Sequence, residues 1–283
     1  MLLNSFLANT TLMWSQSDTL ERYTPVFADE SSNKYNVNNI EYRYNDFGYR
    51  CDNFNDCSDI PIVYLGCSFT EGVGLPIEST WGYLLNERIR AATNKKIPFW
   101  SLAQGGRGLD NQVKLLYEFT RLYPIKYVFC LFPPAGRREY TFRSTRLCAW
   151  SPKTDAEHIP EINRLFSDHH YMMHEDRKYA MMLDLIRSEQ KAQVFTTTWV
   201  RKFPEWVPNR GSLVDYRYAG PIDPRFSEFK HITSFGHTNN GAELGNDRAR
   251  DGIHPGKLYQ LNIANQYWEK VKHLFQIGEQ EGN

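Results

Sequence analysis

Residues 61–72 read PIVYLGCSFTEG, a short apolar run followed by a turn that lies between Gly66 and Gly72. A continuous apolar run of this length is typical of a strand that is covered on both faces of a parallel sheet. Ser68 comes just past the end of this predicted strand. A nucleophilic serine needs this placement, because its Oγ must protrude and its own backbone N–H must be free to bind an oxyanion. The stretch differs from the G-x-S-x-G elbow of α/β-hydrolases, because Thr70 stands in place of the second glycine.

Three further apolar runs have the same character and predict three more strands, at about 97–102, 126–132 and 193–199. Segments with helical periodicity lie between and after these runs, at about 79–92, 109–123, 167–190 and 257–275, with Ser79 as the N-cap of the first. Strands that alternate with helices of this length predict βαβ units, and therefore an α/β fold with a parallel sheet. In such sheets ligands bind at the carboxyl ends of the strands.

The sequence divides into a polar segment and a main domain. Residues 1–58 are rich in Asn, Asp, Ser and Tyr and show no sustained helical period. Alternation at 40–44 and the turn-like sequence NDFG at 45–48 predict a β-hairpin there, packed on the main domain. We expect residues 59–283 to form that domain. Two of its connections, 133–167 and 200–250, are too long for simple turns, and loops of this length are usually lids or walls of a site, or else disordered.

The composition is that of a globular protein without a strongly charged face. The chain has 283 residues, with 33 Lys and Arg against 33 Asp and Glu, so its formal net charge is zero. This balance argues against a nucleic-acid or membrane-surface binder, which would carry a basic patch. A folded chain of this length buries roughly three quarters of its unfolded surface, so we expect its core to need neither a disulfide nor a metal.

The cysteines and the first residues indicate the compartment. The five cysteines show no C-x-x-C spacing: Cys51, Cys57, Cys67, Cys130 and Cys148. Free thiols in a reducing compartment explain this odd set better than a bridge between the first two. The opening sequence MLLNSFLANTTLMW has no basic region and does not read as a signal peptide. No run approaches the ~18 apolar residues of a membrane span. We therefore expect a protein that is cytoplasmic or otherwise not exported by the general secretory route.

A second chemical feature lies just before the last predicted helix, in the sequence DGIHPG at 251–256. Asp251 precedes His254 by three residues on one tight loop, so its carboxylate can accept a hydrogen bond from the imidazole Nδ1. That bond fixes the tautomer and leaves Nε2 to take a proton from a serine. A lone Asp-x-x-His could simply begin a helix. Together with Ser68 at the other end of the α/β unit, the pair indicates a Ser-His-Asp triad.

These residues resemble the SGNH, or GDSL-like, hydrolases. The first block of that family, G-D-S-x-x-x-G, is similar to residues 66–72, and the last block, D-x-x-H-P, matches residues 251–255. The second block, often N-x-G-x-x-G-x-G, resembles residues 101–108, SLAQGGRG. The resemblance extends from about residue 61 to the end of the last predicted helix. It implies a flavodoxin-like three-layer α/β/α sandwich with a mainly parallel sheet of about five strands.

The resemblance also implies the chemistry. Ser68 would be the nucleophile, His254 the base and Asp251 the residue that orients it, while the backbone N–H groups of Ser68 and Gly106 would form the oxyanion hole. The expected activity is that of a serine esterase acting on a short-chain acyl ester. The aromatic loops, which carry Trp150, Trp199 and Trp206, suggest a carbohydrate or similar alcohol. If a sugar hydroxyl replaced water, the same residues would catalyse an acyl transfer.

Two departures from the family pattern matter. Cys67 stands where the family usually has Asp, although that residue is not the triad acid. More seriously, the third block should place an Asn after the third strand, and the sequence there is FPPAGRR. Removing one oxyanion donor typically costs about 10²–10³ in rate. Arg137 or Arg138 could replace the missing donor, and Asn239 and Asn240 are weaker candidates. A binding or structural module that keeps the hydrolase fold with little turnover is therefore the alternative.

Other sites have less support. His170 and His174 lie at helical i, i+4 spacing near Glu175, but the sequence shows no third ligand of obvious spacing, so a polar helix face explains them better than a metal site. Cys67 would point away from Ser68 and into the core. The glycines match neither a phosphate loop nor a dinucleotide fingerprint. We expect no cofactor and no metal, and as partner a small-molecule or carbohydrate acyl ester rather than a nucleic acid or a membrane.

Overall fold

Four parallel strands form one sheet in the computed structural model, which describes residues 6–26, 40–133, 139–142, 145–148, 169–198 and 247–276. The strands are β3 (Ile62–Gly66), β4 (Trp100–Ser101), β5 (Tyr127–Phe132) and β8 (Gln193–Thr198). All four lie where the apolar runs predict them, and their spatial order is β4-β3-β5-β8. In chain order this is 2-1-3-4, the arrangement of flavodoxin-like doubly wound sheets. The sheet has four strands in the described part of the chain, where about five were expected.

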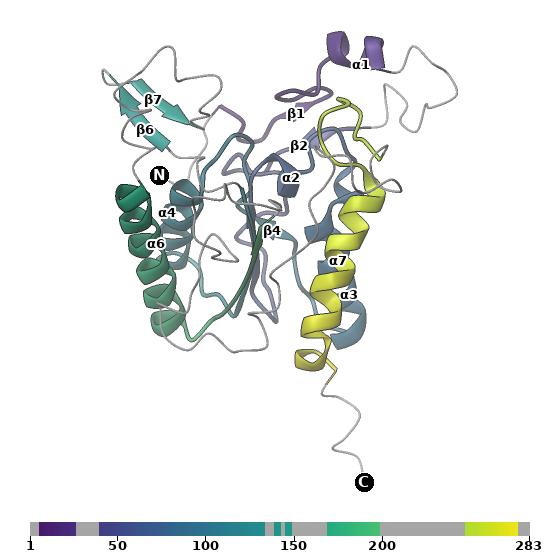
Figure 1. Cartoon of the computed structure of the whole chain (residues 1–283). Coiled ribbons are helices and arrows are strands. Elements are labelled where there is room, and N and C mark those ends of the chain that lie inside the picture. Colours follow the sequence, from purple (N-terminus) through teal and green to yellow (C-terminus); the bar gives the residue numbers. More distant parts are fainter. Residues whose placement is uncertain are drawn as a thin grey trace.

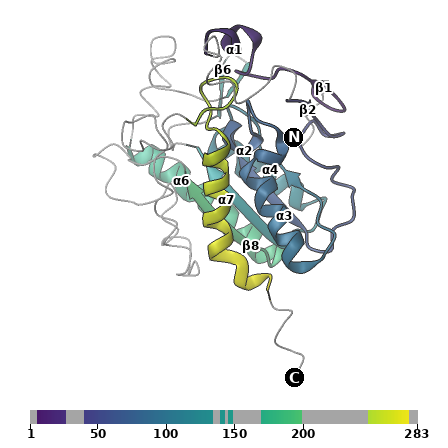
Figure 2. The ribbon, with the colours of Figure 1, turned by 90° about the vertical axis from the view of Figure 1, so that its right-hand side faces the viewer.

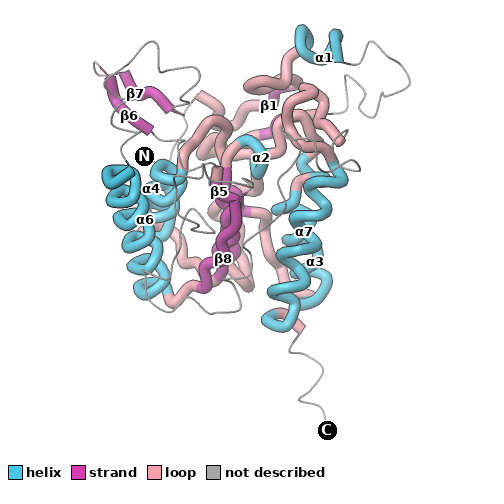
Figure 3. The backbone as a smooth tube through the Cα atoms, viewed as in Figure 1, coloured by secondary structure: helices cyan, strands magenta, loops and turns pink. Residues whose placement is uncertain are grey.

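Helices cover both faces of the sheet, which gives the predicted three layers (Figures 1 and 2). One face packs against α3 (Trp81–Thr93) and α7 (Lys257–Val271), and the other against α4 (Leu109–Thr120) and α6 (His169–Gln190). Side chains alternate along a strand, so each strand contributes to both cores. In the tube view of Figure 3 the strands run between the two helical layers.

The core between the sheet and the α3–α7 layer is rich in aromatic side chains. Tyr64, Phe129 and Phe195 are neighbours on β3, β5 and β8. Their rings stack, with centroids 5.7 Å and 5.0 Å apart. Trp81 of α3 stacks on Tyr267 of α7 at 5.0 Å. Large rings bury much apolar surface at low entropic cost, and stacked pairs add to that gain. The result is a rigid support for the turns at the ends of the strands.

Several boundaries differ from the expected ones. Thr80, not Ser79, is the N-cap residue of α3, because Ile77–Ser79 form a 3-10 turn that sequence periodicity does not reveal. The last helix ends at Val271 and continues as a 3-10 turn over Lys272–Leu274. The expected loop 133–167 contains a two-stranded antiparallel hairpin, β6 (Glu139–Phe142) with β7 (Thr145–Cys148). Most of the expected loop 200–250 lies outside the described residues.

The described parts of the N-terminal segment lie at the end of the sheet where β3 leads into α2 (Ser68–Glu71), as Figure 1 shows. This segment contains β1 (Thr11–Leu12), α1 (Leu20–Val26) and β2 (Tyr42–Arg43). The NDFG turn forms, since the Gly48 N–H donates to the Asn45 carbonyl at 3.0 Å. However, β2 pairs with β1 rather than with residues after that turn. Its partner therefore comes from about thirty residues earlier in the chain rather than from across the turn.

Arg50 attaches the segment to the turn that carries Ser68. Its guanidinium is buried and donates to four backbone carbonyls, those of Glu41, Glu71, Gly72 and Leu75, at 2.8–3.2 Å. Hydrogen bonds from a charged group to carbonyls are among the stronger polar contacts in a folded chain. The polar segment therefore forms part of the wall around the end of the sheet.

The described residues also bear on the predictions for the cysteines and for membrane spans. Cys51, Cys57, Cys67 and Cys130 are free thiols. Among the helices that the structure describes, none has the length and apolar character to span a bilayer.

Candidate active site

The turn after β3 presents Ser68 at the carboxyl end of the sheet. Cys67 is still extended, and α2 begins at Ser68, so the chain reverses within two residues. Gly66 permits this reversal, because a Cβ there would clash with the Thr70 side chain. Gly72 ends α2 in the left-handed region, with φ 77°. Ser68 is 7% exposed, so the surrounding protein fixes its side chain.

The loop before α7 presents Asp251 and His254. The carboxylate oxygen Oδ1 of Asp251 accepts hydrogen bonds from the backbone N–H groups of Ile253 and His254, at 3.0 and 2.9 Å. Such side chain to backbone bonds are typical of Asx turns. Asp247 holds the other side of the loop, since its carboxylate accepts the Tyr259 N–H in the first turn of α7 at 2.9 Å. The sequence D-x-x-H is therefore a pre-formed turn at the start of a helix.

These two turns bring the predicted residues together. The Nε2 of His254 lies 2.8 Å from the Oγ of Ser68, and its Nδ1 lies 2.6 Å from Oδ2 of Asp251. A carboxylate only accepts, so Nδ1 carries the proton and Nε2 accepts the hydrogen bond of the Ser68 hydroxyl. The ring of Phe69 packs against the imidazole edge to face, with centroids 5.5 Å apart. This is the geometry of a nucleophile, a base and an orienting acid.

The Asp251 carboxylate remains ionised in this setting. It is 1% exposed, and burial by itself raises the pKa of a carboxyl group. The hydrogen bonds and the charge interaction with His254, together with a bond from Ser17, outweigh that effect and lower the pKa of Asp251 to about 2. A negative charge is thus fixed beside Nδ1, where it stabilises an imidazolium formed at His254.

Two backbone N–H groups, those of Ser68 and Gly106, have no acceptor among the described residues. The Ser68 N–H is the first of α2 and has no acceptor within the helix. Gly106 lies in the turn after β4 with φ 75°, and its N–H has no acceptor among the described residues. The Gln104 N–H donates to the Gly66 carbonyl at 3.3 Å, which places this turn next to Ser68. The expected third donors, Arg137 or Arg138, lie outside the described residues, as do Asn239, Asn240 and the three loop tryptophans.

Sequence reasoning missed a group of residues from the N-terminal segment. Ser17 donates from its Oγ to Oδ2 of Asp251 at 2.7 Å. Asp18 forms a buried ion pair with Arg250, the neighbour of Asp251, at 2.6 Å. Gln16 donates to the carboxylate of Glu71. The only signal in the sequence is a polar run in a segment otherwise without pattern, and it does not indicate a partner more than two hundred residues away.

Glu71 links the turn that carries Ser68 to the turn that carries Gly106. Its Oε2 accepts the Gly105 N–H at 2.6 Å, and its Oε1 accepts the Tyr44 hydroxyl at 3.2 Å. Burial raises the pKa of this carboxyl group, although the hydrogen bond from Gln16 and the charge of Arg50 act in the opposite direction.

The other residues considered from the sequence are not at this site. Cys67 is buried in the core between the sheet and α3, as expected from its place beside Ser68. His170 and His174 lie within α6, on the far side of the sheet from α3 and α7. Among the described residues, no three His, Cys, Asp or Glu side chains gather as metal ligands would.

No protein-family model and no curated protein matches this chain. Solved structures similar to it include TesA, at 14% identity, with a TM-score of 0.43, covering 76% of this chain and 99% of that one. The psychrotrophic esterase EstA from Pseudoalteromonas sp. is 15% identical, with a TM-score of 0.40 and coverage of 76% and 98%. The acetylxylan esterase Axe2 from Geobacillus stearothermophilus is 13% identical, with a TM-score of 0.42 and coverage of 76% and 94%.

Proposed function

We propose that this protein is a serine esterase in which Ser68 is the nucleophile, His254 the general base and Asp251 the orienting acid. One observation carries the proposal: a continuous hydrogen-bonded chain from the Ser68 hydroxyl through His254 to a buried, ionised carboxylate, at 2.8 and 2.6 Å. Nucleophile, base and orienting group within hydrogen-bond reach of one another are the signature of covalent acyl transfer.

The reaction follows from these positions. Ser68 Oγ attacks the acyl carbonyl carbon while Nε2 of His254 takes the hydroxyl proton, and the carbonyl oxygen becomes an oxyanion. In this proposal the N–H groups of Ser68 and Gly106 donate to that oxyanion and stabilise its charge. The imidazolium then protonates the leaving alcohol, and the C–O bond to it breaks. Water adds to the acyl-enzyme by the same route, with His254 again as base, which releases the acid and restores Ser68.

We further propose that the acyl group is small and that the alcohol is a carbohydrate or a similar polar molecule. The tryptophans in the long loops support the choice of alcohol, since aromatic rings commonly stack on sugar faces, and the lack of a long apolar lid in the sequence supports the small acyl group. Acetate, butyrate and octanoate esters of p-nitrophenol, followed by an acetylated sugar, test these two parts in turn. Higher kcat/KM on octanoate than on acetate would contradict the small acyl group.

The test of the mechanism is hydrolysis of p-nitrophenyl acetate by the wild type and by Ser68→Ala. Loss of the nucleophile typically removes several orders of magnitude in kcat, so we expect the variant to fall to the background rate. An activated phosphonate should label the wild type on Ser68 alone. Circular dichroism must show that both proteins fold alike. A folded wild type that neither exceeds Ser68→Ala nor reacts with the phosphonate would sink the proposal and favour a binding module.

A further inference from the structure

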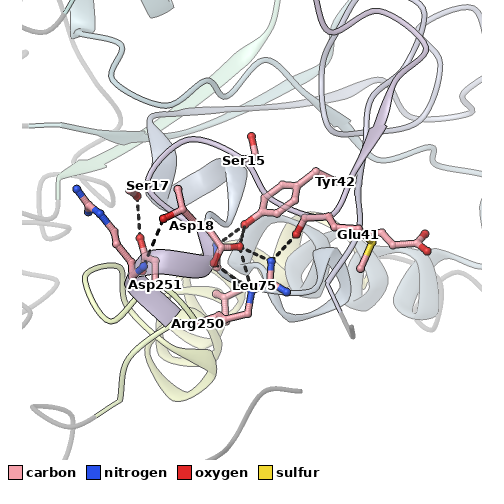
Figure 4. A network of polar contacts seen from close by, with 12 residues as sticks. Ser15, Ser17, Asp18, Glu41, Tyr42, Leu75, Arg250 and Asp251 are labelled. Carbon is pink, nitrogen blue, oxygen red and sulfur yellow. Dashed lines mark hydrogen bonds and ion pairs between the residues drawn. The ribbon is translucent and has the colours of Figure 1, made fainter. Parts of the chain in front are cut away.

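Three consecutive residues of the N-terminal segment contact the residues assigned to catalysis or their neighbours. Gln16 reaches Glu71, Ser17 reaches Asp251, and Asp18 reaches Arg250. Figure 4 shows Ser17 bonded to Asp251, with Asp18 between Tyr42 and Arg250. From these contacts we propose that the N-terminal segment completes the active site and that Ser17 is a positioning residue for the Asp251–His254 pair. The proposal rests on the serine mechanism above.

The position of Ser17 is fixed by a tight turn over residues 15–18. The backbone groups of Ser15 and Asp18 bond to each other in both directions, at 3.1 and 3.0 Å. Gln16 occupies the left-handed region, with φ 58°, which a residue other than glycine rarely adopts. Strain of this kind persists only where surrounding contacts hold it, and it is often found at functional sites.

Contacts on both sides of Ser17 hold the turn against the main domain. On one side the Ser15 hydroxyl bonds to the Tyr44 hydroxyl at 2.9 Å. On the other, the Asp18 carboxylate accepts from Arg250 at 2.6 Å and from the Tyr42 hydroxyl at 2.5 Å, with both charged side chains fully buried. The Ser17 hydroxyl therefore occupies a place that its neighbours determine.

The bond from Ser17 completes the coordination of the Asp251 carboxylate. A carboxylate offers about four acceptor sites. Oδ1 accepts the N–H groups of Ile253 and His254, and Oδ2 accepts the Nδ1–H of His254 and the Ser17 hydroxyl. With donors on every side the carboxylate cannot rotate away from the imidazole. Ser17 also lies 3.4 Å from Nδ1 itself, so it packs against the bond that sets the tautomer.

Substitutions of Ser17 should have the effects expected of a residue that positions the Asp251–His254 pair. Hydrogen bonds to a charged group are among the stronger ones, so Ser17→Ala should lower kcat on p-nitrophenyl acetate about tenfold and leave KM within about twofold. A carboxylate that has lost one donor attracts the imidazolium more strongly, so the acid limb of the kcat/KM profile should move to higher pH. Ser17→Thr, which keeps the hydroxyl, should recover most of the loss. Thr19→Ala removes a hydroxyl two residues away, which accepts the Arg22 N–H and bonds to the Glu21 carboxylate, and it serves as the matched control.

A second measurement does not depend on turnover. In the wild type, NMR should show the proton shared by His254 and Asp251 at low field, and Ser17→Ala should move that resonance by more than Thr19→Ala does. Unchanged kcat, pH profile and resonance in Ser17→Ala, alongside an inactive Ser68→Ala, would refute the positioning role and leave the esterase intact. If the wild type does not exceed Ser68→Ala, the esterase proposal fails. The resonance alone then decides whether Ser17 acts on the pair.

Discussion

The ion pair between Asp18 and Arg250 should be one of the most sensitive points of the fold. Its two side chains have no exposed surface, and they come from opposite ends of the described chain. The Asp18 carboxylate accepts two bonds from the Nε of Arg250, at 3.0 and 3.1 Å, and one from its Nη2 at 2.6 Å. Asp18→Asn preserves the size of the side chain, removes its charge and replaces one acceptor oxygen with an amide donor. The guanidinium then keeps the Met13 carbonyl, at 2.6 Å, and the face of Trp14, at 4.0 Å.

The magnitude follows from the burial of the pair. Removing one partner of a buried ion pair costs about 3–5 kcal/mol, because the other charge stays buried without its counter-charge. A domain has a free energy of unfolding of about 5–15 kcal/mol, so the variant should lose a fifth or more of it. With a urea m-value of about 3 kcal/mol per M, the midpoint should fall by about 1–1.7 M.

Urea unfolding followed by tryptophan fluorescence measures this shift. The matched control is Glu87→Gln, which neutralises the exposed pair with Arg90 on α3. Exposed pairs contribute about 0–1 kcal/mol, so that midpoint should barely move. A loss below about 1 kcal/mol in Asp18→Asn, or losses of equal size in the two variants, would refute the reasoning that burial makes this pair matter.

Two further predictions concern the loop at 249–254. Because the pKa of Asp251 is lowered to about 2 by folding, its stabilisation is fully present above pH 5 and is lost as the pH falls towards 2. Between pH 5 and pH 2 the free energy of unfolding of the wild type should therefore fall by about 2 kcal/mol more than that of Asp251→Asn. Equal slopes of stability against pH in the two proteins would contradict this. Gly74→Ala places a Cβ 2.8 Å from that of Ala249 and 3.0 Å from the Arg250 nitrogen, at φ 77°. This substitution should lower the free energy of unfolding by about 1–3 kcal/mol and should also lower kcat. Gly48→Ala, at φ 81° in the 45–48 turn, should lower the stability alone. Unchanged kcat in Gly74→Ala would show that the loop tolerates the displacement.

The sheet could be predicted because each strand is covered on both faces. Burial on both faces requires a continuous apolar run, which is easy to identify in a sequence. Element ends were less predictable, since the 3-10 turn at Ile77–Ser79 moves the start of α3 by one residue without a change in periodicity. The hairpin expected at 40–48 was wrong in its pairing. A two-residue strand can bond to any free edge, and β1 supplies that edge from about thirty residues upstream.

The candidate site divides in the same way. Ser68, Asp251 and His254 could be selected from the sequence because each lies on a turn next to a strand or a helix. At such turns catalytic residues occur in short motifs with typical spacing. Ser17 could not, because a serine in a polar segment resembles any other until the fold brings it to Asp251. Asp18 and Arg250 were equally hidden, since charged residues are mostly exposed and only tertiary structure shows that these two are buried together.

The pairing of residues 17 and 18 with residues 250 and 251 also sets an order of events during synthesis. At about 5–20 residues per second, the ribosome needs roughly 10–50 seconds to add the residues that separate the two groups. Throughout that interval the Asp18 carboxylate lacks its partner Arg250 and cannot be buried as an ion pair. The turn at 15–18 must therefore remain hydrated while the first strands of the sheet assemble. The nascent chain can therefore build its scaffold early, whereas the proposed catalytic machinery can close only after the loop that carries His254 has left the exit tunnel.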